Sequence, residues 1–167
     1  NDYTGKTVDE VFPNLQLFVH GGVNYAPYKN KLESSFNKPV DSLETFPASE
    51  GFFAYQEKPD VEGLLLNINS GIFFEFIPLN EFYNDEPTRL TVADVELNKN
   101  YALVISSNAG LWAYSIGDTV KFVNKKPLRL VVSGRVKHFI SAFGEHVIGQ
   151  EVDKAISAAT KQFKVII

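Results

Sequence analysis

The sequence predicts an α+β protein that is rich in antiparallel β-sheet. Two observations predict this class. Short apolar segments recur between residues 41 and 134, and glycine, asparagine and proline residues separate them. Helical spacing of apolar residues is found near the two ends of the chain, at residues 25–36 and 146–160. We therefore expect many strands in the middle of the chain, with one helix on each side of them.

A strand and a helix precede the central strands. Residues 15–20 are typical of a short buried strand, which ends at Gly21 and Gly22, where the backbone can turn tightly. Aromatic residues and leucine then recur every three or four positions, which predicts an amphipathic helix over residues 25–36.

The central strands begin with two short candidates, residues 41–46 and 52–57, on either side of the sequence PASEG. Residues 64–79 contain two apolar runs separated by Asn-Ser-Gly at positions 69–71. Because these three residue types favour tight turns, this segment is predicted to form a β-hairpin.

Further strands are predicted in the rest of the central region. Residues 90–100 are typical of a strand followed by a turn. Residues 101–107 and 111–123 are expected to form an antiparallel pair joined at positions 108–110, and residues 128–134 add one more strand.

The pattern changes after Ser133. A short strand-like piece at residues 135–145 comes first, and the helical pattern of residues 146–160 follows. We therefore predict a division of the chain into residues 1–133 and residues 134–167.

Composition excludes several classes of function. Lys and Arg total 16 against 20 Asp and Glu, and this net charge of −4 argues against a nucleic-acid surface. No cysteine is present, so disulfides and thiolate metal sites are excluded. No apolar run is long enough to span a membrane, so we expect no membrane partner, and cytoplasmic residence is compatible with the sequence.

The sequence contains no methionine and closes on the apolar run FKVII. Because an exposed apolar strand promotes aggregation, we expect these residues to be an excerpt of a longer protein. On this expectation, any oligomer would be an artefact of truncation.

Two segments place candidate ligand-binding side chains in turns or on strands. Ser49 and Glu50 in the sequence FPASEG offer a hydroxyl and a carboxylate to a phosphate and its Mg²⁺, although an ordinary polar turn has the same composition. Tyr114 and Asp118 in AYSIGD are four residues apart, so in a regular strand they share a face. Asp118 is then expected in an open cleft without a salt bridge; the alternative is a hairpin-edge aspartate beside a bulge at Gly117.

Other polar residues are less informative. Arg135, Lys137 and His138 follow Gly134 and suit either a cationic hinge near an anionic ligand or a solvated basic turn. His20, His138 and His146 lack metal-ligand spacing. The single tryptophan, Trp112, is expected in the core.

The order of these motifs resembles the plant acyl-acid amido synthetases that conjugate auxin and jasmonate, and more closely their bacterial members. The family belongs to the adenylate-forming superfamily, and the resemblance covers about residues 11–160. Its Tyr-Ala-Ser-Ser-Glu motif corresponds to residues 46–50, its Tyr-Arg-x-Gly-Asp motif to residues 114–118, and the superfamily's Gly-Arg-x-Asp hinge to residues 134–137.

This resemblance implies the C-terminal, β-rich and barrel-like part of a large adenylating domain, followed by the start of a small α/β lid domain. It implies ATP and Mg²⁺ as cofactors, and a small carboxylic acid and an amino acid as partners.

The resemblance also implies a role for individual residues. Phe46 would stack on adenine, Ser49 would reach the α-phosphate, and Glu50 would hold Mg²⁺. Further implied roles are nucleotide binding for Tyr114, Asp118 and Arg135, a place beside the acyl pocket for Gly21 and Gly22, and the hinge for Lys137.

The chain departs from the family pattern in two motifs. Ser115 replaces the motif's arginine, and Lys137 replaces the hinge aspartate. The family's phosphate loop and its lid lysine have no counterpart in these residues, so we expect the 167 residues alone to be inactive. An acyl-CoA-type adenylate-forming ligase and a non-catalytic β-rich binding domain remain alternatives.

Overall fold

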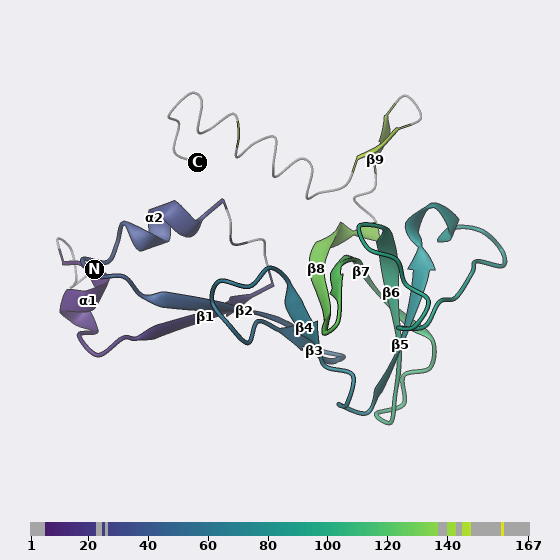
Figure 1. The fold of residues 1–167 in the computed structure, drawn as a ribbon, viewed down its shortest axis with the longest axis horizontal. Coiled ribbons are helices and arrows are strands. Elements are labelled where there is room, and N and C mark those ends of the chain that lie inside the picture. Colours follow the sequence, from purple (N-terminus) through teal and green to yellow (C-terminus); the bar gives the residue numbers. More distant parts are fainter. Residues whose placement is uncertain are drawn as a thin grey trace.

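One eight-stranded sheet forms most of the structure, a computed structural model that describes residues 6–22, 25, 27–136, 140–142, 145–147 and 158 (Figure 1). Its strands are β1 (Leu17–Gly21), β2 (Asp41–Ala48), β3 (Gly51–Tyr55), β4 (Leu64–Leu66), β5 (Ile72–Pro78), β6 (Asn100–Ser107), β7 (Tyr114–Lys125) and β8 (Leu128–Arg135). They are ordered β1-β2-β3-β4-β8-β7-β6-β5. β1 and β2 are parallel, whereas the other neighbours are antiparallel, so the predicted β-rich α+β class is confirmed.

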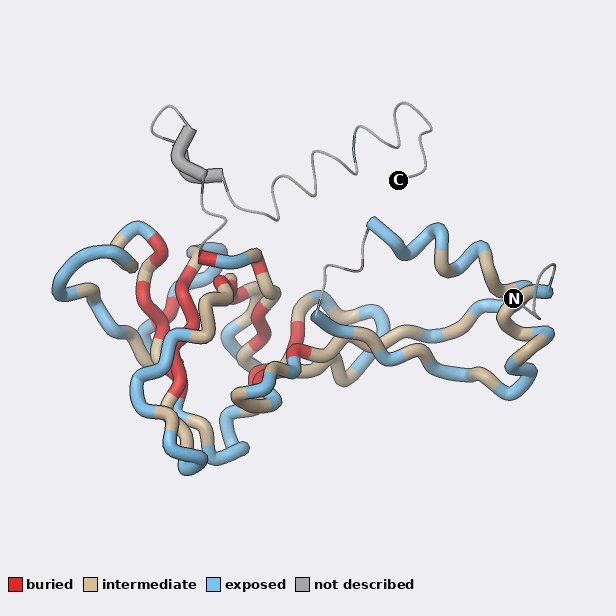
Figure 2. The backbone as a smooth tube through the Cα atoms, turned by 180° about the vertical axis from the view of Figure 1, so that it is seen from behind, coloured by how far each residue is buried: buried red, intermediate tan, exposed pale blue. Residues whose placement is uncertain are grey.

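The sheet curls so that strands far apart in its order face each other. Phe53 on β3 and Phe74 on β5 lie with ring centroids 6.2 Å apart, although four strands separate β3 from β5 in the sheet. Phe76 and Phe122 also pack edge to face, at 5.0 Å. The predicted barrel-like sheet is therefore confirmed, and aromatic rings fill its interior. Figure 2 shows that the buried residues gather in the curled part of the sheet.

The helices bounded within the described residues are short. They are α1 (Val8–Val11), α2 (Lys29–Glu33) and the 3-10 helix η1 (Leu79–Glu81). α2 covers only part of the predicted helix over residues 25–36. The hydroxyls of Ser34 and Ser35 both donate to the carbonyl of Lys31, and such local bonds compete with continued helix at this end. No helix in the described part of the chain is long and apolar enough to cross a membrane.

The hairpin predicted over residues 64–79 is wrong. β4 pairs with β3 and β8, and β5 pairs with β6, so the two apolar runs are not neighbours in the sheet. Leu64 and Leu66 on β4 and Phe74 and Phe76 on β5 all point into the same core. The connection at residues 67–71 therefore joins two walls of the curled sheet, where nonlocal partners bury both apolar runs.

Residues 90–100 do not form the predicted strand before Asn100. Thr91 and Asp94 close a turn, in which the Thr91 hydroxyl donates to the Asp94 carboxylate at 2.7 Å. Isolated bridges at Leu90 and Leu97 tie the segment to β5 and β7. Val95 is fully buried, so this loop covers the core without extending the sheet.

The antiparallel pair predicted on either side of positions 108–110 is confirmed as β6 and β7. Gly110 makes the turn with φ of 97°, a backbone conformation that favours glycine. Trp112, however, is 82% exposed, so its predicted core position is wrong. It lies between the turn and the start of β7, so it is outside the strand in which every second side chain points into the core.

Beyond β8, the structure describes β9 (Ile140–Ala142) and β10 (Glu145–Val147), which form a small antiparallel hairpin. The short strand-like piece predicted at residues 135–145 fits this hairpin. The helix predicted over 146–160 does not begin at His146, which is in β10. Apart from residue 158, the remainder of that predicted helix lies outside the described residues.

Candidate functional site

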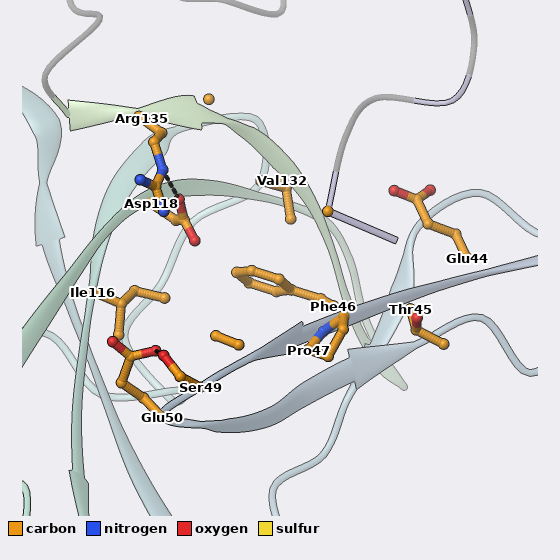
Figure 3. A pocket seen from close by; sticks show the side chains of 13 residues that line it. Glu44, Thr45, Phe46, Pro47, Ser49, Glu50, Ile116, Asp118, Val132 and Arg135 are labelled. Atoms are coloured by element: carbon orange, nitrogen blue, oxygen red, sulfur yellow. Dashed lines mark hydrogen bonds and ion pairs between the residues drawn. The ribbon is translucent and has the colours of Figure 1, made fainter. Parts of the chain in front are cut away.

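A single pocket brings together segments that are far apart in the sequence. It has a volume of about 450 Å³ and opens between β2, the β2–β3 turn, β7 and β8 (Figure 3). Its lining includes six of the residues predicted from the sequence: Gly22, Phe46, Ser49, Glu50, Asp118 and Arg135. The remaining lining residues are Glu44, Thr45, Pro47, Ala48, Ile116, Val132 and Gly134.

Phe46 forms the apolar centre of the pocket. Its ring is only 5% exposed and packs edge to face on Phe53, with centroids 5.2 Å apart. Figure 3 shows the ring between Ile116 on β7 and Val132 on β8. The β2–β3 register shifts between Phe46 and Pro47, so the strand is irregular where it meets the pocket. A flat apolar ligand in the pocket can therefore contact the Phe46 ring and the aliphatic side chains of Ile116 and Val132.

The β2–β3 turn supplies a hydroxyl and a carboxylate. Ser49 and Glu50 are the only residues between the end of β2 and the start of β3, and both line the pocket. The Ser49 hydroxyl donates a hydrogen bond to the Glu50 carboxylate at 2.9 Å. Both residues border the pocket, as the ligand-binding interpretation of this turn requires.

Asp118 and Arg135 form an ion pair at the opposite wall. Arg135 Nε donates to Asp118 Oδ1 at 2.7 Å, and the Asp118 side chain is only 14% exposed. The two residues are direct partners in the β7–β8 register, which places their side chains on the same face. Asp118 does line the pocket, but the predicted unpaired carboxylate is wrong, because its cross-strand neighbour neutralises it.

Glu44 is a pocket residue that was not predicted from the sequence. Its main-chain nitrogen and oxygen both bond to Gln56, which fixes this part of β2 against β3. Burial raises the pKa of the Glu44 carboxyl above its ordinary value of 4.5. The sequence did contain one indication that Glu44 is a pocket residue. Glu44 lies two residues before Phe46 in the same strand, and this spacing places both side chains on one face.

Two of the predicted residues that the structure describes are not part of this pocket lining, and the first of them is Tyr114, whose side chain is exposed. The β6–β7 register is irregular between Ala102 and Val104, and Gly117 has φ of 81°. Regular alternation therefore does not run from Tyr114 to Asp118, and the two side chains do not share the pocket face.

The second is Gly21. Gly21 is needed for packing between β1 and β2, because a Cβ at this position would lie 2.5 Å from the carbonyl oxygen of Thr45. Its neighbour Gly22 lines the pocket and has φ of 86°. Lys137 lies outside the described residues.

The donor set of the pocket fits Mg²⁺ only in part. The described residues contain no group of three or more His, Cys, Asp or Glu side chains that could hold a metal ion. Mg²⁺ is commonly bound by one or two carboxylates together with the phosphate oxygens of a substrate. One of the carboxylates on the pocket wall, that of Glu50 beside the Ser49 hydroxyl, fits that arrangement.

Comparisons with known proteins agree on one family. The model of the GH3 family central domain matches residues 65–135, which run from β4 to the end of β8. A jasmonoyl–L-amino acid synthetase of Nicotiana attenuata is 32% identical over 68% of this chain and 21% of its own length. An indole-3-acetic acid-amido synthetase of Arabidopsis thaliana is 27% identical over 93% of this chain and 31% of its own length. The chain thus spans between about a fifth and a third of these curated relatives.

Solved structures show the same fold. The GH3.15 acyl acid amido synthetase superposes with a TM-score of 0.73 at 18% identity, over 93% of this chain and 28% of its own. An anthranilate CoA ligase in complex with anthranoyl-AMP superposes with a TM-score of 0.53 at 15% identity, over 82% of this chain and 28% of its own. The fold is therefore shared across amido synthetases and CoA ligases.

Proposed function

Since residues 65–135 form a GH3-type central domain in a chain of the adenylate-forming fold, we propose that the pocket is the nucleotide side of a ligase site. The ligase joins a carboxylic acid to an amino acid through an acyl-adenylate, with ATP and Mg²⁺ as cofactors. The relatives in plants are named for jasmonate and indole-3-acetic acid conjugation, but nothing in the pocket selects either acid for this chain.

The convergence of three segments on one pocket supports this proposal most strongly. The residues matching the first motif lie at the end of β2 and the β2–β3 turn, the aspartate of the second lies on β7, and the arginine of the third ends β8. Glu50 and Asp118 are far apart in the sequence, and the curl of the sheet brings both to the pocket wall. A ligand in this pocket can therefore contact all three segments at once.

We assign the base and phosphate contacts to the first motif. Phe46 contacts the adenine ring, Ser49 donates to the α-phosphate, and Glu50 would hold Mg²⁺. The buried ring, the hydroxyl and the carboxylate on the pocket wall support these roles. When bound there, Mg²⁺ would neutralise part of the charge that develops on the phosphates.

The remaining roles belong to β7, β8 and the segments beside them. Asp118 accepts hydrogen bonds from the ribose hydroxyls, and Arg135 contacts ribose or phosphate, which requires the present ion pair to rearrange. Gly22 borders the ligand on the side of β1. We further propose that residues 134–167 begin a lid domain whose hinge is Lys137.

In this chemistry the protein acts more by positioning the substrates than by forming covalent bonds with them. A carboxylate oxygen of the acid attacks the α-phosphorus of ATP, and pyrophosphate leaves with the electron pair of the broken P–O bond. The amino nitrogen of the second substrate then attacks the acyl carbon and loses a proton to solvent, and AMP leaves.

An activity assay of the natural polypeptide that carries these residues tests the proposal. It is incubated with ATP, Mg²⁺, a panel of carboxylic acids and a panel of amino acids, and AMP and the coupled product are measured. Product that depends on an amino acid supports the proposal, whereas product that depends on CoA indicates an acyl-CoA ligase. Absence of AMP with every acid would contradict both and favour a binding domain.

The 167 residues by themselves are expected to be inactive in ATP–pyrophosphate exchange. The phosphate loop and the lid lysine that the family resemblance implies have no counterpart in these residues, and the chain spans 28% of the GH3.15 structure. Exchange above the rate of a Glu50→Ala variant would contradict this expectation.

A further inference from the structure

The outer face of the barrel wall carries a second apolar cluster. Phe76 on β5 and Leu103 on β6 are register partners in the aromatic core, and the next pair along these strands, Ile77 and Ala102, lies on the opposite face. There the chain buries a separate set of side chains, which comprises Ile77, Leu79, Ala102, Val104 and Val136. We call this set the outer cluster. Its members on β5, η1 and β6 are joined by Val136, which directly follows β8.

The end of β8 therefore has side chains in two different environments. Arg135, the last residue of β8, lines the pocket and reaches Asp118 on β7 (Figure 3). Val136, the next residue, is only 3% exposed and packs in the outer cluster. The backbone that carries the pocket arginine is thus attached by its neighbour to the wall formed by β5 and β6.

This attachment matters because little else fixes the Arg135 side chain. The side chain is 61% exposed, and its Nε donates to Asp118 Oδ1 at 2.7 Å. That contact has to rearrange before the guanidinium can reach a ligand. A long side chain that leaves its partner has many rotamers, so the position of its backbone decides which of them can reach the ligand.

We propose that Val136 is a positioning residue, which holds the end of β8 against the outer cluster so that Arg135 is directed into the pocket while its side chain exchanges Asp118 for a ligand. The effect on ATP rests on the proposed nucleotide site. The fixing of the end of β8 does not depend on that function.

Steady-state kinetics of the natural polypeptide tests the proposal with the variant Val136→Ala, which removes two buried methyl groups beside Arg135. The KM for ATP is expected to rise roughly three- to tenfold, a part of what the burial of two methyl groups is worth. A variant that is merely less stable has a smaller folded fraction, which lowers the apparent kcat and leaves KM unchanged. An unchanged KM would therefore overturn the inference.

Val104→Ala is the matched control, because it makes the same substitution in the same cluster. Val104 is 1% exposed on β6, far in the sequence from Arg135. Both variants are expected to lower the Tm, but only Val136→Ala should raise the KM for ATP. An equal rise in the two variants would overturn the specific role of Val136.

A double variant tests whether Val136 acts through Arg135. In the Arg135→Gln background, Val136→Ala is expected to leave the KM for ATP unchanged, because the group that it positions has been removed. A rise as large as in the unaltered background would overturn the inference.

Hydrogen exchange of the same polypeptides separates this inference from the proposed function. The amides of residues 133–135 are expected to exchange faster in Val136→Ala than in Val104→Ala. Equal exchange at these amides would overturn the inference, whatever the activity. If the unaltered polypeptide released no AMP, the proposed function would fail, and hydrogen exchange would still decide whether Val136 fixes the end of β8.

Discussion

Two regions of the molecule are held together in different ways. The arm, defined as the described residues of 6–45, contains α1, β1, α2 and the start of β2, whereas the barrel comprises residues 46–136. Every buried residue among those described lies in the barrel, and none lies in the arm (Figure 2). The pocket lies where the two regions meet, on β2.

The contacts within the arm are mostly exposed and polar. The main-chain nitrogen of Asn37 donates to the Asp9 carboxylate at 3.0 Å, and Lys38 Nζ donates to the carbonyl of Pro13 at 2.8 Å. The first of these bonds lowers the pKa of the Asp9 carboxyl. Exposed hydrogen bonds of this kind contribute little net stability, whereas burial of aromatic rings contributes much. The arm therefore depends on the barrel for its order.

The largest effect is expected from truncation of the barrel core. Phe76 is fully buried, and Phe76→Ala is expected to lower the free energy of unfolding by about 3–5 kcal/mol through lost burial and a cavity. Urea denaturation measures it. The matched arm variant is Phe12→Ala, whose ring is 62% exposed and whose cost is expected to stay within about 0.5 kcal/mol. Similar losses in the two variants would contradict the distinction between arm and barrel.

A smaller and local effect is expected at the junction of β1 and β2. A Cβ in Gly21→Ala would lie 2.5 Å from the Thr45 carbonyl, so the strands must separate, at a cost of about 1–3 kcal/mol. Hydrogen exchange should accelerate at the amides of β1 while those of β6 keep their protection. Val19→Ala, an exposed change on the same strand, should leave both unchanged. Faster exchange throughout the barrel would show that the two regions unfold together.

The smallest effect concerns ion pairs. Arg129 on β8 is buried and makes a two-pronged contact with Glu57, which lowers the pKa of the Glu57 carboxyl below its ordinary value of 4.5. Because the folded pKa is the lower one, this contribution is present above pH 4.5 and is lost as the pH falls through the folded pKa. Glu57→Gln should therefore cost roughly 1 kcal/mol at pH 7 and less at acidic pH.

The arm provides the control for that measurement. Lys29 and Glu33 form an exposed pair along α2, at 3.7 Å. Because water screens such a pair, Glu33→Gln should leave the free energy of unfolding nearly unchanged at pH 7. Urea denaturation measures both variants. If Glu57→Gln and Glu33→Gln lowered the free energy of unfolding equally, the assignment of the stronger ion pair to the barrel would be contradicted.

Much of the local structure was predictable because it depends on nearby residues. Gly110 marked the β6–β7 turn correctly, since its positive φ is a local requirement. The order of the motifs also indicated the amido synthetase family, which the match of residues 65–135 and the curated relatives confirm. The pairing of β4 was mistaken, because a run of leucines predicts a strand without naming its partner.

Prediction of the candidate site met the same limit, because the sequence does not name spatial neighbours. The sequence pointed to Ser49, Glu50 and Asp118 one at a time, and it missed Glu44, whose spacing from Phe46 carries meaning only once β2 is known to border a pocket. The ion pair of Asp118 was also missed, because the β7–β8 register that places its partner opposite it is set by the whole sheet.

By itself, the sequence determined the strand-rich class, the main turns and the identity of the polar groups, because these depend on side-chain chemistry and short-range backbone preferences. The tertiary structure alone decided which strands pair, how the sheet curls and which charges meet in the pocket. Those properties depend on burial shared between residues that are distant in the sequence, and an apolar segment can satisfy the same local pattern against many different partners.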